Sequence, residues 1–394
     1  MRSRDPPRDS DPRALGILAS MPSQDVPIRA THLPFDPGNP YQQRLSDELR
    51  QIGVEVSRRA LSLHPAYRQW RRWHADIVHY HWLSPADFGG DRWRIARRLR
   101  MESFFAQLRL LKAHRPAVVW TIHNLADHES PDPREDVRFL ARMCAAVDAC
   151  VVHSESARSE VLSAVASAGA DPAIITPKLH VVPHGNYVGC YRPARSRSEQ
   201  RARLGLADHH VLVAALGQIR EYKNAVALIH AFRHGADDDL RLLIGGSPRT
   251  ASLDASIRAA IAGDPRILYQ PGFLPDGELA AHLEACDVVA LPYRACLTSG
   301  AAILAMTFGK PVIAPDRGCF REILAAQAHL LYDERDPQGL PEAIARCARA
   351  QDVIESAGAA NRVAAEAMPW SNAAAKTREL YVRLRARGAE ARDR

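Results

Sequence analysis

Residues 297–315 read LTSGAAILAMTFGKPVIAP, and this stretch predicts a turn, a short helix and a buried strand in succession. Thr298 or Ser299 can cap the N-terminus of the helix, and Gly300 lets the backbone come close to a ligand. Gly309 ends the helix before the apolar residues of the strand. A helix N-terminus with free N–H groups, a hydroxyl and a glycine can bind an anion such as a diphosphate. An ordinary capped helix between two strands is the alternative interpretation.

Apolar runs of strand length lie on both sides of this stretch and alternate with longer amphipathic segments. Such alternation indicates βαβ units and parallel sheets, hence an α/β fold. A polar, Arg-rich segment with proline at residues 190–205 predicts a linker between two doubly wound domains. Because such sheets bind ligands beyond the carboxyl ends of their strands, we expect the site in the cleft between the domains. The expected strands are residues 15–20, 76–82, 117–122, 149–154, 179–183, 211–217, 240–246, 266–272, 287–293 and 311–315.

The composition excludes several classes of protein. With 394 residues, of which 46% are hydrophobic, the chain can fill real cores, so disordered, collagen-like and disulfide-scaffold classes are excluded. The net charge of +7 comes with only five lysines among 52 basic residues. Because a bias toward arginine can reflect coding preference, the charge is weak evidence for nucleic acid, and we expect no nucleic-acid partner.

The cysteine pattern and the hydropathy favour a cytoplasmic location. The seven cysteines include no C-x-x-C pair, which favours a reduced chain without structural zinc. No apolar stretch approaches the roughly 20 residues that span a bilayer, so we expect neither secretion nor membrane insertion.

A second informative segment, GQIREYKN at residues 217–224, follows an expected strand and opens a helix. Arg220 and Lys223 lie three positions apart at the carboxyl end of that strand, so both can point at phosphate oxygens in the cleft. A solvated Arg–Lys pair explains these two residues equally well when they are taken alone.

Together these segments resemble the C-terminal domain of GT-B glycosyltransferases, especially family 4 and its relatives. The resemblance covers nearly the whole chain beyond residue 13 and implies two Rossmann-like, doubly wound parallel-sheet domains that face a central cleft. In the C-terminal half it rests on G-x-I-R-x-x-K-N at 217–224, G-F-L-P-D-G-E-L at 272–279, C-D-V-V-A-L-P at 286–292 and S-G-x-x-x-L-A-M-x-x-G-K-P-V-I-A at 299–314. In the N-terminal half it rests on N-P-Y-x-x-x-L at 39–45, D-I-V-H-x-H-W at 76–82, T-I-H-N at 121–124 and V-V-P-H-G-N-Y at 181–187.

The resemblance implies a glycosyltransferase that moves a sugar from a UDP- or GDP-sugar to a hydroxyl of a saccharide, lipid-linked or small-molecule acceptor. It assigns acceptor binding to residues 14–190 and nucleotide-sugar binding to residues 191–369, and it implies that residues 370–390 form a helix that crosses back. Residues 1–13 are predicted to be disordered. The donor diphosphate is expected at Gly217, Arg220, Lys223, Ser299, Gly300 and Ala301, and the nucleoside and sugar at Gly245, Phe273, Leu274, Thr298 and Glu322. No metal or other cofactor is expected, because cationic side chains and a helix dipole can stabilise the leaving group.

One departure from the family concerns two glutamates eight positions apart, where this chain has Leu297 and Ala305. Since those carboxylates contact the donor sugar and the ribose in the family, the sugar and the stereochemistry stay open. The candidate catalytic residues are His123, Asp127 and Glu129, because in similar enzymes a histidine at the first position meets the donor sugar. Either acid could be the general base of an inverting reaction. In a retaining reaction the leaving phosphate can take the proton instead.

Acceptor contacts are expected from Asn39, Tyr41 and His81. Asn39 followed by Pro40 is also a plain helix start, and that interpretation is favoured for the pair. Residues 184–187 are interpreted as a hinge. The acidic run 237–239 is interpreted as a solvated loop and not as a metal site.

Residues 58–115 hold 13 Lys/Arg against 4 Asp/Glu, so this basic region could make a peripheral contact with an anionic membrane. A solvated basic helix face is the alternative. Two other functions also stay open, a nucleotide-sugar epimerase and a catalytically inactive nucleotide-sugar-binding protein. The aromatic residues that could anchor the basic region are Trp70, Trp73, Trp93, Phe104 and Phe105.

Overall fold

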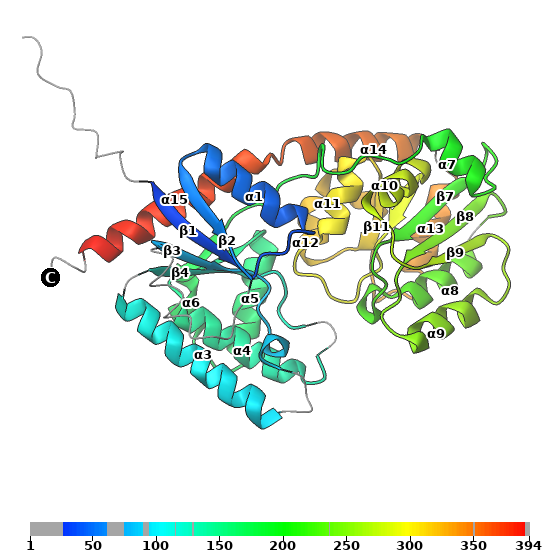
Figure 1. The fold of residues 1–394 in the computed structure, drawn as a ribbon. Coiled ribbons are helices and arrows are strands. Elements are labelled where there is room, and N and C mark those ends of the chain that lie inside the picture. Colours follow the sequence, from blue (N-terminus) through cyan, green and yellow to red (C-terminus); the bar gives the residue numbers. More distant parts are fainter. Residues whose placement is uncertain are drawn as a thin grey trace, which may run out of the picture.

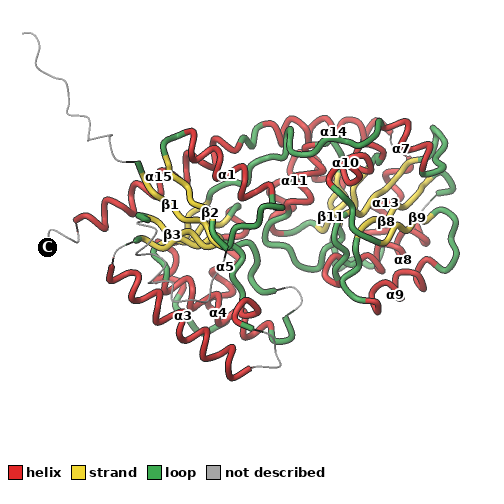
Figure 2. The backbone as a smooth tube through the Cα atoms, viewed as in Figure 1, coloured by secondary structure: helices red, strands yellow, loops and turns green. Residues whose placement is uncertain are grey.

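The computed structural model describes residues 27–60, 75–89, 94–114, 116–127, 130–235, 237–349 and 351–390. Its helices and strands form two layered α/β units that lie next to each other (Figure 1). Figure 2 shows the strands in two separate groups, each surrounded by helices. Each group is a six-stranded sheet in which every pairing is parallel, so the predicted doubly wound α/β fold is confirmed.

The N-terminal unit is built on a sheet with the strand order β2-β1-β3-β4-β5-β6. Its strands are β1 (Ile28–Leu33), β2 (Val54–Arg58), β3 (Ile77–Tyr80), β4 (Ala117–Thr121), β5 (Ala149–Val152) and β6 (Leu179–Val181). Its helices are α1 (Pro40–Gln51), α3 (Arg94–His114), α4 (Pro133–Ala146), α5 (Glu155–Ser167) and α6 (Pro172–Ile175), with 3-10 turns at η1 (Pro85–Phe88) and η3 (Thr176–Lys178).

The C-terminal unit is built on a sheet with the order β12-β11-β10-β7-β8-β9. Its strands are β7 (Val211–Leu216), β8 (Leu240–Gly246), β9 (Ile267–Pro271), β10 (Val288–Ala290), β11 (Val312–Pro315) and β12 (Leu331–Tyr332). Its helices are α7 (Arg197–Arg203), α8 (Ala225–Gly235), α9 (Ala251–Ile261), α10 (Asp276–Ala285), α11 (Gly300–Thr307), α12 (Gly318–Ile323), α13 (Gly339–Arg349) and α14 (Gln351–Glu366), with 3-10 turns at η4 (Glu221–Lys223) and η5 (Ala325–Leu330).

Nine of the ten expected strands are present, and the tenth, residues 15–20, lies outside the described residues. The apolar pattern missed β1, β2 and β12. In β1 the reason is burial of polar groups, because Thr31 and His32 face the interior with 1% and 0% of their surface exposed. A strand whose interior side chains are polar has no apolar run to reveal it.

The C-terminal helix α15 (Trp370–Glu390) packs against α1 of the N-terminal unit, as the resemblance implied (Figure 1). Trp370, Ala374 and Tyr381 belong to the same buried cluster as Tyr41 of α1. A Cβ atom on Gly185 would lie 2.2 Å from the Trp370 ring, so the backbone can pass this ring only with a glycine at position 185. The chain is thus closely packed at the crossing between the units, and the interpretation of residues 184–187 as a hinge stays a prediction.

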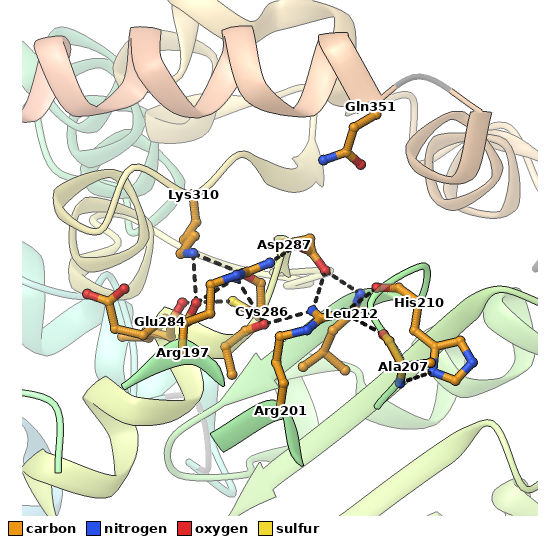
Figure 3. Close-up of polar contacts among 12 residues, drawn as sticks. Arg197, Arg201, Ala207, His210, Leu212, Glu284, Cys286, Asp287, Lys310 and Gln351 are labelled. Carbon is orange, nitrogen blue, oxygen red and sulfur yellow. Dashed lines mark hydrogen bonds and ion pairs between the residues drawn. The ribbon is translucent and has the colours of Figure 1, made fainter. Parts of the chain in front are cut away.

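The segment 190–205 is only partly a linker, because residues 197–203 form α7, which is packed on the C-terminal unit. Arg197 and Lys310 both donate to carbonyl groups at the C-terminal end of α10 (Figure 3). The carboxylate of Asp287 accepts from Arg197, from Arg201 and from the N–H of Leu212, at 2.5, 3.1 and 2.7 Å. The expectation of a free linker was wrong for these residues, because the arginines that make the segment look solvated bind groups of the domain.

Candidate active site

Two cavities lie at the carboxyl ends of the strands. The N-terminal cavity, of about 360 Å³, is lined by residues 82–87, 120–121, 123–127, Asp136, Phe139 and Leu140. The interdomain cavity, of about 520 Å³, is lined from the N-terminal unit by residues 125–127, Pro133 and Glu160, and from the C-terminal unit by Tyr222 and residues 294–297 and 317–318. Residues 125–127 line both cavities, so this short segment separates two neighbouring spaces.

The turn after β7 brings Lys223 over a glycine pair. Gly217 has φ +99°, and a Cβ on Gly246 would lie 1.6 Å from the Gly217 carbonyl oxygen, so the turn rests directly on the end of β8. The Nζ atom of Lys223 lies 5.5 Å from the centre of the Tyr293 ring. Its ammonium group has no hydrogen-bond or ion-pair partner within the described part of the chain. Burial, and to a smaller extent the positive charge of Arg220, lower the pKa of Lys223 to about 8.

Arg220 lies just before η4, half-buried, with one Nη atom donating to the Gln218 side chain at 2.7 Å. The structure thus brings Arg220 and Lys223 together at the end of β7, close enough for their charges to interact. Two cations in one turn repel each other, and Glu221 is the carboxylate that lies between them in the sequence. An anion bound here would relieve that repulsion.

The N-terminus of α11 has the predicted geometry. Ser299 is the N-cap, and its hydroxyl accepts from the N–H of Ala302 at 3.1 Å. Gly300 is approached by the Tyr187 hydroxyl, which would lie 2.9 Å from a Cβ atom there. The Oγ1 atom of Thr298 is buried and, among the described residues, unpaired. A phosphate at this helix end would therefore lie beside the Tyr187 phenol, a residue that motif reasoning assigned to the hinge alone.

The structure disperses the residues expected at the nucleoside and the sugar. Gly245 packs against Leu274, whose Cδ1 would lie 3.4 Å from a Cβ there, while Phe273 is 81% exposed. The Glu322 carboxylate accepts from the backbone N–H groups of Glu155 and Ser156 at the start of α5, at 3.2 and 3.0 Å. In this arrangement Glu322 links the two units, so contact with a ribose requires that this link break.

The two positions at which the resemblance implied glutamates are apolar and buried. Leu297 is 3% exposed and joins the core cluster of the N-terminal unit, although it follows β10 of the C-terminal unit. Ala305 is fully buried inside α11. Leu297 therefore makes an apolar contact between the two units.

His123 lies at the centre of an aromatic cluster in the N-terminal unit. Its ring stacks on Trp82 with 3.9 Å between centroids, and its Nε2 lies 3.4 Å from Nδ1 of His81. The pKa of His123 is well below its usual value, first because of burial and then because of the neighbouring histidines. His123 is therefore a neutral hydrogen-bonding group. Sequence reasoning missed Trp82, although it ends a quoted motif; its φ of +38° turns the chain sharply after β3.

His32, His79 and His81 form the one group in the described part of the chain with the spacing of metal ligands, their nitrogens lying within 4.8 Å of one another. Two of these histidines already have strong partners. The Tyr381 hydroxyl lies 3.1 Å from Nε2 of His32 and 2.6 Å from Nδ1 of His79. The second nitrogen of His79 lies 2.7 Å from the Thr121 hydroxyl. These bonds attach α15 to the sheet and give the histidines a structural role.

Asn39 and Tyr41 act beneath the site. The Asn39 side chain caps α1 by accepting from the N–H of Tyr41 at 3.0 Å, as the cap interpretation predicted. Tyr41 is 4% exposed, and its ring contacts His81 and His123 edge-on. His81 is itself fully buried. Of the predicted acceptor residues, Tyr41 and His81 thus lie around His123 as buried supports, while Asn39 is half-buried and caps α1.

Asp127 is exposed at the boundary of the two cavities, while Glu129 lies outside the described residues. Two further carboxylates that sequence reasoning missed line the N-terminal cavity. Asp136, in the first turn of α4, accepts from the N–H of Asp127 at 3.3 Å, and Asp87 caps η1 by accepting from the N–H of Ser84 at 2.7 Å. Loss of hydration raises the pKa of both carboxyl groups, and Asp127 contributes by charge repulsion. The spacing Ser84-x-x-Asp87 is a capping signal that could have revealed the turn.

Two expected membrane anchors belong to the core. Phe104 and Phe105 are 8% and 4% exposed and pack in the main cluster of the N-terminal unit. The prediction that they anchor the basic region was wrong, because α3 turns this face to the sheet and to α4. Trp70, Trp73 and Trp93 lie outside the described residues.

Comparison with known proteins agrees with the fold and the motifs. Residues 210–350 match the family model described as glycosyl transferases group 1. The chain is 28% identical to a D-inositol 3-phosphate glycosyltransferase of Streptomyces bingchenggensis, over 78% of this chain and 66% of that protein. It is 26% identical to a GDP-mannose:glycolipid 4-beta-D-mannosyltransferase of Xanthomonas campestris, over 73% of this chain and 72% of that protein.

Solved structures share the fold at low sequence identity. Sucrose-phosphate synthase from Thermosynechococcus elongatus superposes with a TM-score of 0.69 at 18% identity, over 91% of this chain and 99% of that one. HepE of Anabaena in complex with UDP superposes with a TM-score of 0.64 at 15% identity, over 93% of this chain and 100% of that one. The C-terminal part of the chain therefore resembles the group 1 glycosyl transferases, and the chain has the GT-B fold of these solved structures.

Proposed function

We propose that this glycosyltransferase moves a sugar from a UDP- or GDP-sugar in the interdomain cavity to a hydroxyl of an acceptor in the N-terminal cavity. The observation that carries the proposal is that residues 125–127 line both cavities. A reaction between two bound molecules needs their reacting atoms in contact across one boundary. The names of the relatives support a nucleotide-sugar donor, since the Xanthomonas protein is named for GDP-mannose and HepE was solved with UDP.

The C-terminal unit holds the donor in this proposal. Lys223 and Arg220 bind the diphosphate, and the N-terminus of α11 adds N–H groups beside Tyr187. As the sugar leaves, negative charge grows on the diphosphate, and these fixed positive groups stabilise it. Catalysis then needs no metal ion, so treatment with EDTA should leave turnover unchanged.

His123 and Asp127 act on the acceptor side. Neutral His123 can donate one hydrogen bond to a donor-sugar hydroxyl, with Trp82 and His81 fixing its ring. Asp127 is placed at the boundary, where it can accept the proton of an attacking hydroxyl if the reaction inverts configuration. If configuration is retained, the leaving phosphate takes that proton and Asp127 orients the acceptor.

We also propose a peripheral contact of α3 with anionic lipid. Among the described helices, none combines the length and the apolar character needed to cross a bilayer. On the outer face of α3, however, Ile95, Leu99 and Leu110 are 80%, 65% and 51% exposed, beside exposed Arg98 and Arg109. Apolar residues flanked by arginines on one helix suit an interface with anionic headgroups. Co-sedimentation with anionic vesicles should fall when Ile95 and Leu99 are replaced by Ser.

The proposed function is tested by calorimetry and product analysis. UDP or GDP should bind the wild-type chain, and the double variant Arg220→Ala, Lys223→Ala should bind at least about tenfold more weakly, because two charge-assisted contacts are lost. Unchanged affinity in the double variant would contradict the donor assignment. Product analysis then separates the alternatives: a new free sugar without acceptor indicates an epimerase, and binding without turnover on any acceptor indicates an inactive binding protein.

A further inference from the structure

The two cavities differ in the charge of their lining residues. The carboxylates of Asp87, Asp127 and Asp136 line the N-terminal cavity, and none of its described lining residues is a lysine or an arginine. The interdomain cavity, by contrast, is lined by Arg294 and Arg317 together with the carboxylates of Glu160 and the shared Asp127. A short segment thus separates an acidic space from one that contains cations.

The N-terminal cavity also has features of a built ligand site. Trp82 and His123 form a stacked aromatic pair on its wall, which offers the apolar surface that a sugar ring requires. Trp120 lines the same cavity at 3% exposure, and its indole N–H has no hydrogen-bond partner among the described residues. A buried N–H without a partner is costly, and a ligand hydroxyl or ring oxygen in the cavity could satisfy it.

We infer that the acceptor unit seated in the N-terminal cavity is an uncharged or cationic sugar or polyol, and that phosphorylated acceptors are rejected there. This inference rests on the proposed function and adds the charge class of its acceptor. Carboxylates accept hydrogen bonds from sugar hydroxyls and attract an amino sugar, but they repel a phosphate. The same repulsion keeps the donor diphosphate on the side of the boundary where the arginines lie.

The three carboxylates have different structural tasks, which decides the variant to use. Asp136 is 4% exposed and holds the backbone of the boundary segment, and Asp127 is a catalytic candidate. Asp87 lies on the rim and bonds only Ser84 among the residues described. Asp87→Asn keeps its shape and removes its charge. Asp208→Asn, in an exposed loop before β7, is the matched control.

The test compares acceptors that differ only in charge. The full chain is given labelled UDP-glucose or GDP-mannose as the donor. Two pairs of acceptors are compared, myo-inositol with inositol 3-phosphate and methyl glucoside with glucose 6-phosphate, and methyl glucosaminide is the cationic acceptor to be compared with glucose 6-phosphate. The uncharged or cationic member should have a kcat/KM at least about tenfold above that of its phosphorylated partner. Asp87→Asn should reduce this ratio of kcat/KM values by about threefold, because it removes one of the charges that repel the phosphate. A rise in salt from about 0.05 to about 0.5 M should have the same effect, because screening weakens the interaction of exposed charges.

Each outcome has a definite meaning. Equal or better use of the phosphorylated acceptors overturns the inference while leaving the proposed glycosyl transfer intact. A ratio that Asp208→Asn changes as much as Asp87→Asn does also overturns it, since the effect would then follow total charge and not the cavity. Failure of every donor to turn over with any acceptor overturns the proposed function and the inference that rests on it.

Discussion

Raising the pH should weaken the binding of a nucleoside diphosphate because Lys223 loses its charge. In the free protein the pKa of Lys223 is lowered from 10.5 to about 8 by burial and by Arg220. A bound diphosphate favours the charged ammonium and raises this pKa back toward its ordinary value. Binding therefore takes up a proton above about pH 8, and affinity falls as the pH rises through that range.

The magnitude follows from the two pKa values. At about pH 7 roughly nine-tenths of the free Lys223 is charged, and at about pH 9 roughly one-tenth, while the bound form stays charged at both. The expected loss of affinity is about tenfold, or about 1.4 kcal/mol. This range lies above the last ionisation of the diphosphate, near pH 6, so the ligand contributes little to the change.

Isothermal titration calorimetry with UDP and GDP across this pH range measures the effect directly. Lys223→Arg keeps its charge throughout, so its affinity should not depend on pH there. Lys376→Arg, on the exposed face of α15, should keep the pH dependence of the wild type. Equal wild-type affinity at both ends of the range, or an undiminished pH dependence in Lys223→Arg, would refute the assignment of Lys223 to the diphosphate.

Three further perturbations test the fold that positions the site. Asp287→Ala should lower the free energy of unfolding by about 3 to 5 kcal/mol, because it leaves Arg197 and Arg201 of α7 without their carboxylate. Urea unfolding measures this change, and a loss below about 1 kcal/mol would contradict a structural role for the contacts of Asp287. Glu322→Ala removes the hydrogen bonds that link α12 of the C-terminal unit to the start of α5 in the N-terminal unit, which are worth about 1 kcal/mol. The population in which the two units have moved apart should therefore rise about fivefold. An unchanged radius of gyration in X-ray scattering would argue against this role of Glu322. Acidification should destabilise the N-terminal unit, because burial lowers the pKa values of His32, His153 and His184 to about 3, 4 and 3. Below about pH 6.5 these histidines take up protons only in the unfolded chain, so at about pH 5 the three together should lower the free energy of unfolding by about 6 kcal/mol. Equal urea midpoints at about pH 7 and about pH 5 would contradict this prediction.

The sequence predicted the elements whose information is local. The segment 297–315 became a capped helix and a strand as expected, with Ser299 at the cap and Gly309 at φ +64°. Arg220 and Lys223 are brought together because three residues of one turn join them. Runs of apolar side chains sufficed for nine strands, since a parallel strand covered on both faces must be apolar along its length.

Tertiary packing decided what no local pattern contains. His32 and Tyr381 are 349 positions apart, yet they share a hydrogen bond that fixes α15 to the first sheet. Phe104 and Phe105 look like lipid anchors among arginines, and only the orientation of α3 shows that they fill the core.

The acidic character of the N-terminal cavity is likewise visible only after folding, because Asp87 and Asp136 come from segments that the sequence keeps apart. Periodicity and capping act within one helix or strand, so a sequence displays them. Burial, charge and the pairing of side chains depend on which elements meet in space, and for this protein that meeting determines where the donor and the acceptor can bind.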